Sequence, residues 1–226
     1  DKEGVLDLRV GGLFHDIAKP HTRRRSKEKN DYTFHGHEVV GGKVTREIMS
    51  RMKFSREMID KVSTLVRWHM FFSDTEQITL SAVRRIVSHV GEQNIWDLMN
   101  LRICDRIGTG RPKENPYRFR KYKAMVEQAL RDPISVKMLK MNGEQIMEVT
   151  KQTPGPKIGY VLHALLEEVL EDPEKNTFDY LSQKAKELII LDVESLKLMG
   201  EQGKIKKEEV EAGEVEKLHM KHNVSK

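Results

Sequence analysis

Cysteine is nearly absent from this chain of 226 residues, in which Cys104 is the only one. A disulfide within the chain is therefore excluded, which is typical of proteins in a reducing compartment, and we expect a cytoplasmic location. The sequence also lacks a run of roughly eighteen apolar residues, the length that a membrane-spanning helix needs. We therefore expect no membrane partner.

Aromatic residues make up only 6% of the chain and prolines number 7. Neither a phosphate-binding P-loop nor a GxGxxG dinucleotide motif occurs. Apolar residues recur at helical spacing, and no alternating strand pattern of any length is present. The sequence therefore predicts an all-α fold. The net charge of +5 permits a polyanionic partner such as RNA without requiring one.

Glycine and proline in 109–116 predict a loop and a boundary there. We expect a first helical domain over 1–110, a smaller C-terminal helical region over 111–191, and a charged helical tail over 192–226. Helices are predicted over 5–17, 35–52, 55–71, 82–90, 94–107, 117–131, 142–149, from 156 onward, and over 178–191. Residues 19–31 are predicted as a polar loop.

Particular side chains are expected at the ends and contacts of these helices. Ser55, Ser81 and Asn142 are expected to cap the helices that follow them, and Gly91 to end the helix before it. Asn176 with Asp179 resembles a cap pair for the last helix. The neighbouring Gly11 and Gly12 are expected to let another helix or a ligand approach closely.

Histidine and aspartate side chains suited to metal binding are spread over the first half of the chain. His15 and Asp16 are adjacent, and two such ligands from one turn of backbone suit a divalent metal. His37, His69 and Asp105 fall in three further predicted helices, and bundles build metal sites from ligands on separate helices.

Each of these ligand assignments has an alternative. His69 lies on an apolar helical stripe, where a histidine is often a core residue with a satisfied hydrogen bond. Asp105 falls on a buried face, where it needs a partner. A metal would serve, and so would Arg102 or Arg106.

Basic side chains gather in two segments. The polar loop after Asp16 carries Lys19, Arg23, Arg24 and Arg25, which fit either a solvated loop or a basic flap that attracts phosphate. The predicted helix from 117 contains basic side chains interleaved with aromatic ones. This pattern favours either nucleic-acid binding or a helix that buries Phe119, Tyr122 and Met125 while its basic residues face the solvent. Its basic residues are Arg118, Arg120, Lys121 and Lys123.

Five short motifs occur in a characteristic order: HDIAKP at 15–20, FHGHE at 34–38, MSRMKFS at 49–55, DRIGTG at 105–110 and TPGPKIG at 153–159. This order resembles the HD superfamily of metal-dependent phosphohydrolases. More narrowly, it resembles the HD domain of bacterial tRNA nucleotidyltransferases (CCA-adding enzymes) and related poly(A) polymerases. The resemblance covers residues 5–190 and implies an HD-domain helical bundle followed by a C-terminal helical region.

The resemblance also implies a metal-dependent phosphohydrolase acting on 2′,3′-cyclic phosphates or phosphomonoesters near the 3′ end of RNA, with tRNA as partner. It implies a divalent metal (Mn, Fe, Ni, Co, Zn or Mg) and selects His37 rather than His35 as ligand. Asp16 would bridge metals and Lys19 would offset phosphoryl charge. The implied ligands are His15, Asp16, His37, His69 and Asp105.

Two parts of the family pattern are not in this sequence: a further ligand histidine before the His-Asp pair, and a nucleotidyltransferase head. We therefore expect a fragment of a longer protein that does not itself add nucleotides. Two alternatives stay open. One is a non-catalytic helical RNA-binding scaffold of a tRNA nucleotidyltransferase, and the other is an inert structural remnant.

Overall fold

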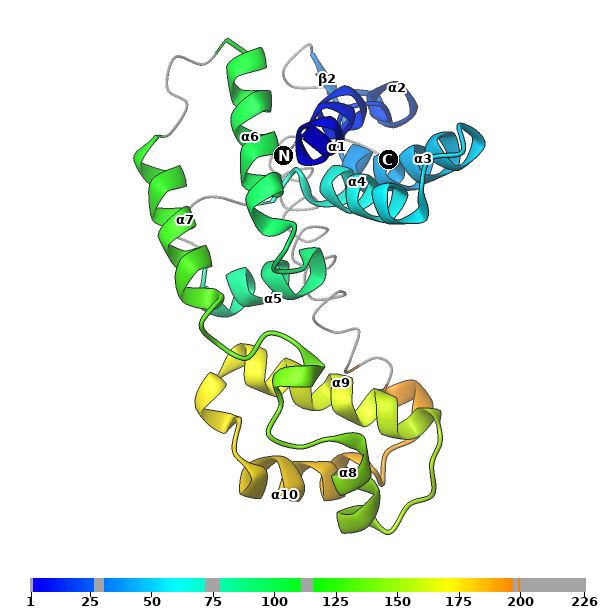
Figure 1. Ribbon diagram of the computed structural model, residues 1–226, viewed down its shortest axis with the longest axis vertical. Helices are drawn as coiled ribbons and strands as arrows, with labels where there is room; N and C mark the ends of the chain where they lie inside the picture. Colours follow the sequence, from blue (N-terminus) through cyan, green and yellow to red (C-terminus); the bar gives the residue numbers. More distant parts are fainter. Residues whose placement is uncertain (1, 27–30, 72–77, 111–115, 197–198, 200–226) are drawn as a thin grey trace. The chain divides into compact units, whose positions relative to one another are not determined.

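The computed structural model describes residues 2–26, 31–71, 78–110, 116–196 and 199. Within these residues the chain is almost entirely helical (Figure 1), which confirms the all-α prediction. The longer helices are α1 (Lys2–Phe14), α3 (His37–Arg51), α4 (Arg56–Trp68), α5 (Leu80–Val90), α6 (Ile95–Gly108), α7 (Tyr117–Ala129), α8 (Gly143–Thr150), α9 (Pro156–Glu171) and α10 (Phe178–Leu188). The short 3-10 turns η1 (Val136–Met138) and η2 (Pro173–Lys175) lie between them.

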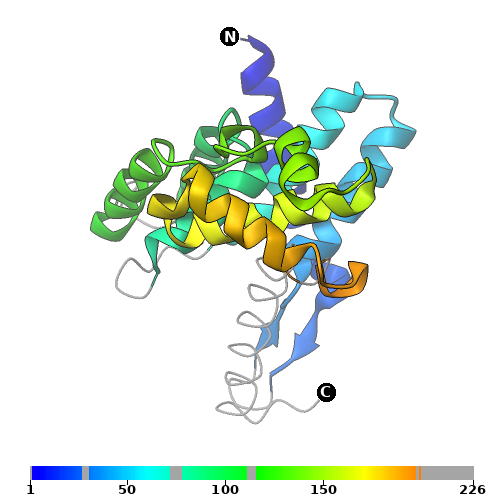
Figure 2. The same cartoon turned by 90° about the horizontal axis from the view of Figure 1, so that it is seen from below.

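The segment after Asp16 differs from the predicted loop. It begins with α2 (Lys19–Thr22), and β1 (Arg24–Arg25) then pairs antiparallel with β2 (Tyr32–Thr33). Figure 2 shows these two short strands side by side. Strands of two residues are too short to produce an alternating pattern, so the sequence could not indicate them. Residues 27–30 of the predicted loop lie outside the described residues.

The described chain divides into two compact units, and the division is discontinuous in sequence. The first unit takes its described residues from 1–77 and 90–123, which include α1 to α4 and α6. The second takes them from 78–89 and 124–196, which include most of α5 and all of α8, α9 and α10. The predicted domain boundaries at 110 and 191 stay a prediction.

The core of the first unit forms where α1, α3 and α4 meet. Met49, Ile59, Val62 and Val66 are buried there, and Val10, Phe14, Phe54 and Met58 pack against them. Lys61 of α4 forms two ion pairs at this contact. Its Nζ lies 2.9 Å from a carboxylate oxygen of Asp7 and 2.9 Å from a carboxylate oxygen of Asp97. These contacts hold α1, α4 and α6 together.

Two glycines of α3 allow α4 to approach closely. A Cβ atom at Gly41 would lie 3.2 Å from Val66, and one at Gly42 would lie 3.0 Å from Cβ of Arg67 and 3.2 Å from the carbonyl oxygen of Ser63. The expectation for Gly11 and Gly12 was wrong. A Cβ at Gly11 would meet only ordinary contacts and one at Gly12 would meet nothing within 4 Å.

Several predicted helix ends are confirmed. Ser55 caps α4 by accepting from the Met58 amide at 3.3 Å. Asn142 and Gln145 form a capping box at α8. Gly91 follows α5 with a φ of +88°, in the left-handed region that favours glycine.

Two cap assignments were wrong by one or two residues. Thr79, not Ser81, accepts from the Ala82 amide at 3.2 Å. Thr177 caps α10, because Asn176 is buried and occupied elsewhere. The Asn176 side chain accepts from the amide of Lys140 and donates to the carbonyl of Met138, thereby tying η1 to η2.

A buried arginine organises the second unit. Nε of Arg84 on α5 donates to Asp132 at 2.7 Å, and its Nη1 donates to the carbonyl of Leu170 at 3.1 Å. That carbonyl belongs to the last turn of α9, where helix carbonyls lack partners within the helix. In the described part of the chain, no helix is both long and apolar enough to span a bilayer.

The glycine contacts predict opposite effects of one substitution at two helical sites. Gly42→Ala should lower the free energy of unfolding by about 1–3 kcal/mol, because the added methyl overpacks the α3–α4 contact. Gly159→Ala should raise it by about 0.5–1 kcal/mol, because alanine favours the helix and nothing lies within 4 Å of the new methyl. Urea unfolding followed by circular dichroism measures both. Stabilisation by Gly42→Ala would contradict the packing.

Candidate metal centre

Three segments of the first unit bring histidine and aspartate side chains together. His15 and Asp16 directly follow α1, and the amide of His15 still donates to the carbonyl of Gly11 at 2.8 Å. His37 is the first residue of α3, and His69 directly follows α4. The site therefore lies where the end of α1 meets the open ends of the α3–α4 hairpin.

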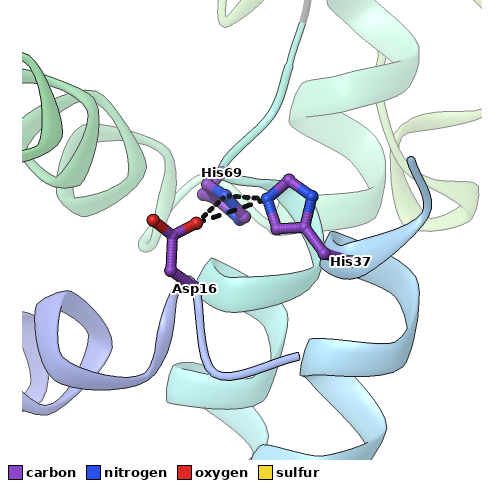
Figure 3. Close-up of side chains that lie close together, drawn as sticks. All are labelled: Asp16, His37 and His69. Atoms are coloured by element: carbon purple, nitrogen blue, oxygen red, sulfur yellow. Dashed lines mark hydrogen bonds and ion pairs between the residues drawn. The ribbon is translucent and has the colours of Figure 1, made fainter. Parts of the chain in front are cut away.

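Asp16, His37 and His69 form the centre of the cluster (Figure 3). Oδ1 of Asp16 lies 3.4 Å from Nε2 of His37 and 3.9 Å from Nε2 of His69. The two Nε2 atoms are 3.2 Å apart. One ligand atom from each residue lies within 4.8 Å of the others, close enough to share one cation. Both histidines are buried, whereas Asp16 keeps 34% of its side chain exposed.

Backbone carbonyls fix how the two imidazole rings point. Nδ1 of His37 lies 2.6 Å from the carbonyl oxygen of Phe34, and Nδ1 of His69 lies 2.7 Å from that of Val66. A carbonyl only accepts, so we assign the ring proton to Nδ1 in both neutral histidines. Metal-binding histidines are oriented in this way.

This proton assignment leaves Nε2 of His37 and Nε2 of His69 without a proton, with their lone pairs facing each other. With Nδ1 protonated, the two Nε2 atoms at 3.2 Å both present lone pairs to each other and to a carboxylate. This arrangement is unfavourable unless a proton or a metal cation lies among the three groups. Imidazole and carboxylate are ligands that Mn, Fe, Ni, Co and Zn accept. The residues present therefore fit a divalent metal.

The pKa values of the three groups follow from burial and from these contacts. Burial lowers the pKa of His69 to about 4. Burial also acts to lower the pKa of His37, but hydrogen bonds to Asp16 and Phe34 outweigh it and raise that pKa. Burial acts to raise the pKa of Asp16, but hydrogen bonds with His15, His37 and Lys19 hold it well below its ordinary value. The carboxyl group of Asp16 is therefore ionised at neutral pH.

His15 and Asp105 lie on the other side of Asp16. Nε2 of His15 is 3.2 Å from Oδ2 of Asp16 and 3.7 Å from Oδ1 of Asp105, and its Nδ1 contacts the carbonyl of Gly12 at 2.8 Å. Hydrogen bonds with Asp105 and Asp16 raise the pKa of His15 to about 10. Asp105 also accepts from Arg102 at 2.8 Å, the arginine alternative that the sequence offered.

The predicted ligands therefore fall into two groups that share Asp16. Asp16, His37 and His69 converge on one point, whereas His15 and Asp105 form an ion pair beside it. His15 would have to release a proton before it could bind a metal. The full set of five ligands stays a prediction. His35 is exposed and lies outside the converging group.

Lys19 also lies at the site. Its Nζ is 2.6 Å from Oδ2 of Asp16 and 5.7 Å from the centre of the Phe34 ring. With 40% of its side chain exposed, Lys19 is accessible from the solvent.

The predicted RNA-binding residues lie outside the metal cluster. Arg23 stacks on Tyr32 at 3.5 Å, and Arg24 and Arg25 are exposed on β1. On α7, Arg118, Arg120 and Lys121 are exposed and Lys123 is half-buried.

Two of the three aromatic residues of α7 are buried, whereas Tyr117 at its start is exposed. Phe119 and Tyr122 are buried, and Tyr122 stacks on Phe71 with ring centres 4.9 Å apart. The two interpretations offered by the sequence are therefore compatible, since burial of the aromatic side chains leaves the basic ones in solvent.

The sequence interpretation missed the carbonyls that orient the rings. In each case the acceptor lies three residues before the histidine: Gly12, Phe34 and Val66. Each histidine lies near a helix end, where the carbonyl three residues earlier is within reach of its ring. The residue types at 12, 34 and 66 do not indicate this contact. The contribution of Gly41 and Gly42 to holding α3 against α4 was also missed.

Comparison with protein families gives this site its context. Residues 2–108, which contain all five predicted ligands, match the family model of the HD domain. Residues 2–108 belong to the HD-domain family.

The HD domain and the region after it are also similar to curated proteins. The chain is 34% identical over 165 residues to a CC-adding tRNA nucleotidyltransferase of Thermus thermophilus, covering 73% of this chain and 36% of the relative. It is 32% identical over 165 residues to an A-adding tRNA nucleotidyltransferase of Deinococcus radiodurans, covering 72% and 37%. The chain thus spans little more than a third of the length of these relatives. No solved structure matches.

The geometry of the HD site predicts a loss of metal binding on a single substitution. His69→Ala should weaken binding of Mn²⁺ or Ni²⁺ at least about tenfold, because even groups that only orient a ligand typically contribute 10–100-fold. The matched control is His163→Ala, which removes an exposed histidine of α9 in the second unit. Calorimetric titration of both variants measures the effect. Equal affinities of the two variants for the metal ion would contradict metal binding by His69.

Proposed function

We propose that the HD domain of this protein is a metal-dependent phosphohydrolase centred on Asp16, His37 and His69. The observation that carries the proposal is the convergence of two Nε2 atoms, 3.2 Å apart, on the carboxylate of Asp16. HD domains bind divalent metals, and this part of the chain is an HD domain. Substrates of the class we propose are 2′,3′-cyclic phosphates and phosphomonoesters.

A bound divalent metal would supply a Lewis acid and lower the pKa of water for attack on phosphorus. The protein side chains would do the rest. Asp16 offers Oδ1 to the converging group and Oδ2 to His15 and Lys19, so it would fix the position of the metal relative to both. Lys19 is exposed enough to leave Asp16 and meet a phosphoryl oxygen, where its charge would stabilise the transition state.

The proposal predicts that Asp16→Asn abolishes hydrolysis. Loss of the carboxylate removes a charged ligand, and we expect the rate of 2′,3′-cyclic AMP hydrolysis with added Mn²⁺ or Ni²⁺ to fall at least about a hundredfold. Asp179→Asn is the matched control, since Asp179 is exposed in the second unit. Chromatographic detection of the nucleotide product measures the rate. Retained hydrolysis in folded, metal-loaded Asp16→Asn protein would refute the proposal.

A second function, RNA binding by the helical body, is favoured by the exposed basic residues and by the relatives, which are tRNA nucleotidyltransferases. We propose tRNA as the partner. Binding should weaken steeply with salt, because Lys and Arg that neutralise phosphates release counterions. Replacing the four basic residues of α7 with alanine should lower the salt slope by about one for each phosphate that these side chains neutralise. These residues are Arg118, Arg120, Lys121 and Lys123.

The control for this experiment is a second set of four basic residues, Arg131, Lys137, Lys140 and Lys186, replaced together. Filter binding of labelled tRNA over a range of salt concentrations gives both slopes. An equal reduction of the slope in both sets would show that net charge alone acts. An unchanged slope in the α7 variant would contradict RNA binding at this helix.

A further inference from the structure

The first unit contains a cavity that neither the metal cluster nor the proposed hydrolysis explains. Its volume is about 410 Å³, within the range of roughly 300–1,000 Å³ that is usual for small-molecule sites. Residues near the end of α6 and the start of α7 form its walls. The lining residues are Arg102, Arg106, Pro116, Tyr117, Arg118 and Phe119.

The charge of the cavity favours an anion. Three of the lining residues are arginines, and none of the described lining residues is acidic. One guanidinium nitrogen of Arg102 donates to Asp105. A guanidinium carries five N–H donors in a planar fork, so this bond leaves others for a ligand. Phosphate oxygens match that fork geometry.

The aromatic residues of the cavity favour a flat apolar group beside the anion. Tyr117, the first residue of α7, has 70% of its side chain exposed, whereas Phe119 is nearly buried. An exposed aromatic ring next to arginines is the arrangement on which nucleobases stack in single-stranded nucleic acids. The lining thus combines the two features that recognise a nucleotide.

One hydrogen bond and two ion pairs connect the cavity to the metal cluster. Arg102 lines the cavity and donates to Oδ2 of Asp105 at 2.8 Å, and Oδ1 of Asp105 lies 3.7 Å from Nε2 of His15. His15 in turn contacts Asp16 at 3.2 Å. A ligand bound to Arg102 would therefore be linked to Asp16 through Asp105 and His15.

We propose that this cavity binds one nucleotide unit, with its base against Tyr117 and its phosphate among Arg102, Arg106 and Arg118. The inference rests on the proposed phosphohydrolase function, for which it names the part of the first unit that binds the base and a phosphate of the nucleotide. A free nucleotide and the terminal nucleotide of an RNA strand share this chemistry, and the experiment below separates them.

The test is binding of AMP, ribose 5-phosphate and inorganic phosphate to the full chain in the presence of EDTA, which makes the readout independent of hydrolysis. Tyr117→Ala should weaken AMP binding roughly tenfold because the base can no longer stack, and should leave ribose 5-phosphate unchanged. Tyr117→Phe retains the ring and should bind AMP like the parent protein. Arg118→Ala should weaken both ligands, whereas Arg131→Ala, outside the cavity, should weaken neither.

The outcomes separate this inference from the proposed function. AMP binding that is weakened roughly tenfold in Tyr117→Ala, with ribose 5-phosphate binding unchanged, supports the cavity even if no hydrolysis is found. Hydrolysis of 2′,3′-cyclic AMP with AMP binding unaffected by both Tyr117→Ala and Arg118→Ala would overturn the cavity and leave the hydrolase intact. Equal binding of AMP and inorganic phosphate would overturn the base-binding part. A short RNA that binds at least as tightly as AMP, with the same weakening in Tyr117→Ala, would identify an RNA terminus as the source of the nucleotide.

Discussion

The contact on which the site depends is the approach of two imidazole nitrogens, Nε2 of His37 and Nε2 of His69, to 3.2 Å. Each ring is held by a hydrogen bond from Nδ1 to a backbone carbonyl three residues earlier, so neither can turn its proton toward the other. The repulsion between the lone pairs is relieved when a proton or a metal cation lies between the rings. The protein tolerates this arrangement because the helices that carry the histidines are closely packed.

That close packing has its origin in the composition of α3. Gly41 and Gly42 carry no side chains that would keep α3 and α4 apart. The core residues Met49, Val62 and Val66 hold the two helices together. His37, the first residue of α3, and His69, which directly follows α4, are thereby brought side by side. Asp16 then completes the site from the end of α1, whose Val10 and Phe14 pack against the same core.

Asp16 joins two environments that differ in chemistry. One carboxylate oxygen faces the imidazole rings of His37 and His69, and the other faces His15 and Lys19. Beyond His15, the ion pair with Asp105 leads to Arg102 and to the basic cavity. A phosphoester held across this sequence of groups would meet a metal on one side and guanidinium groups on the other.

Much of this arrangement was predictable from the sequence. Helical spacing of apolar residues placed the helices to within a few residues, and the order of the HD-type motifs indicated the family and the three residues that converge in the structure. Caps such as Ser55 and Asn142 were correct because their side chains act on the adjacent backbone.

What could not be predicted depends on contacts between distant residues. The sequence left Asp105 open between a metal and an arginine, and only the fold shows that Arg102 reaches it while His15 lies on its other side. Asn176 was assigned as a cap because its type favours one, yet it binds the distant backbone of Met138 and Lys140.

The most direct test of metal binding by the two histidines is X-ray absorption at the metal edge of the Ni²⁺-bound protein. We expect a first shell of nitrogen and oxygen with the outer-shell scattering of at least two imidazole rings, and loss of that imidazole signal when His37 and His69 are both replaced by alanine. A shell of oxygen alone in the parent protein, or an imidazole signal that survives the double replacement, would contradict a metal centre at these histidines.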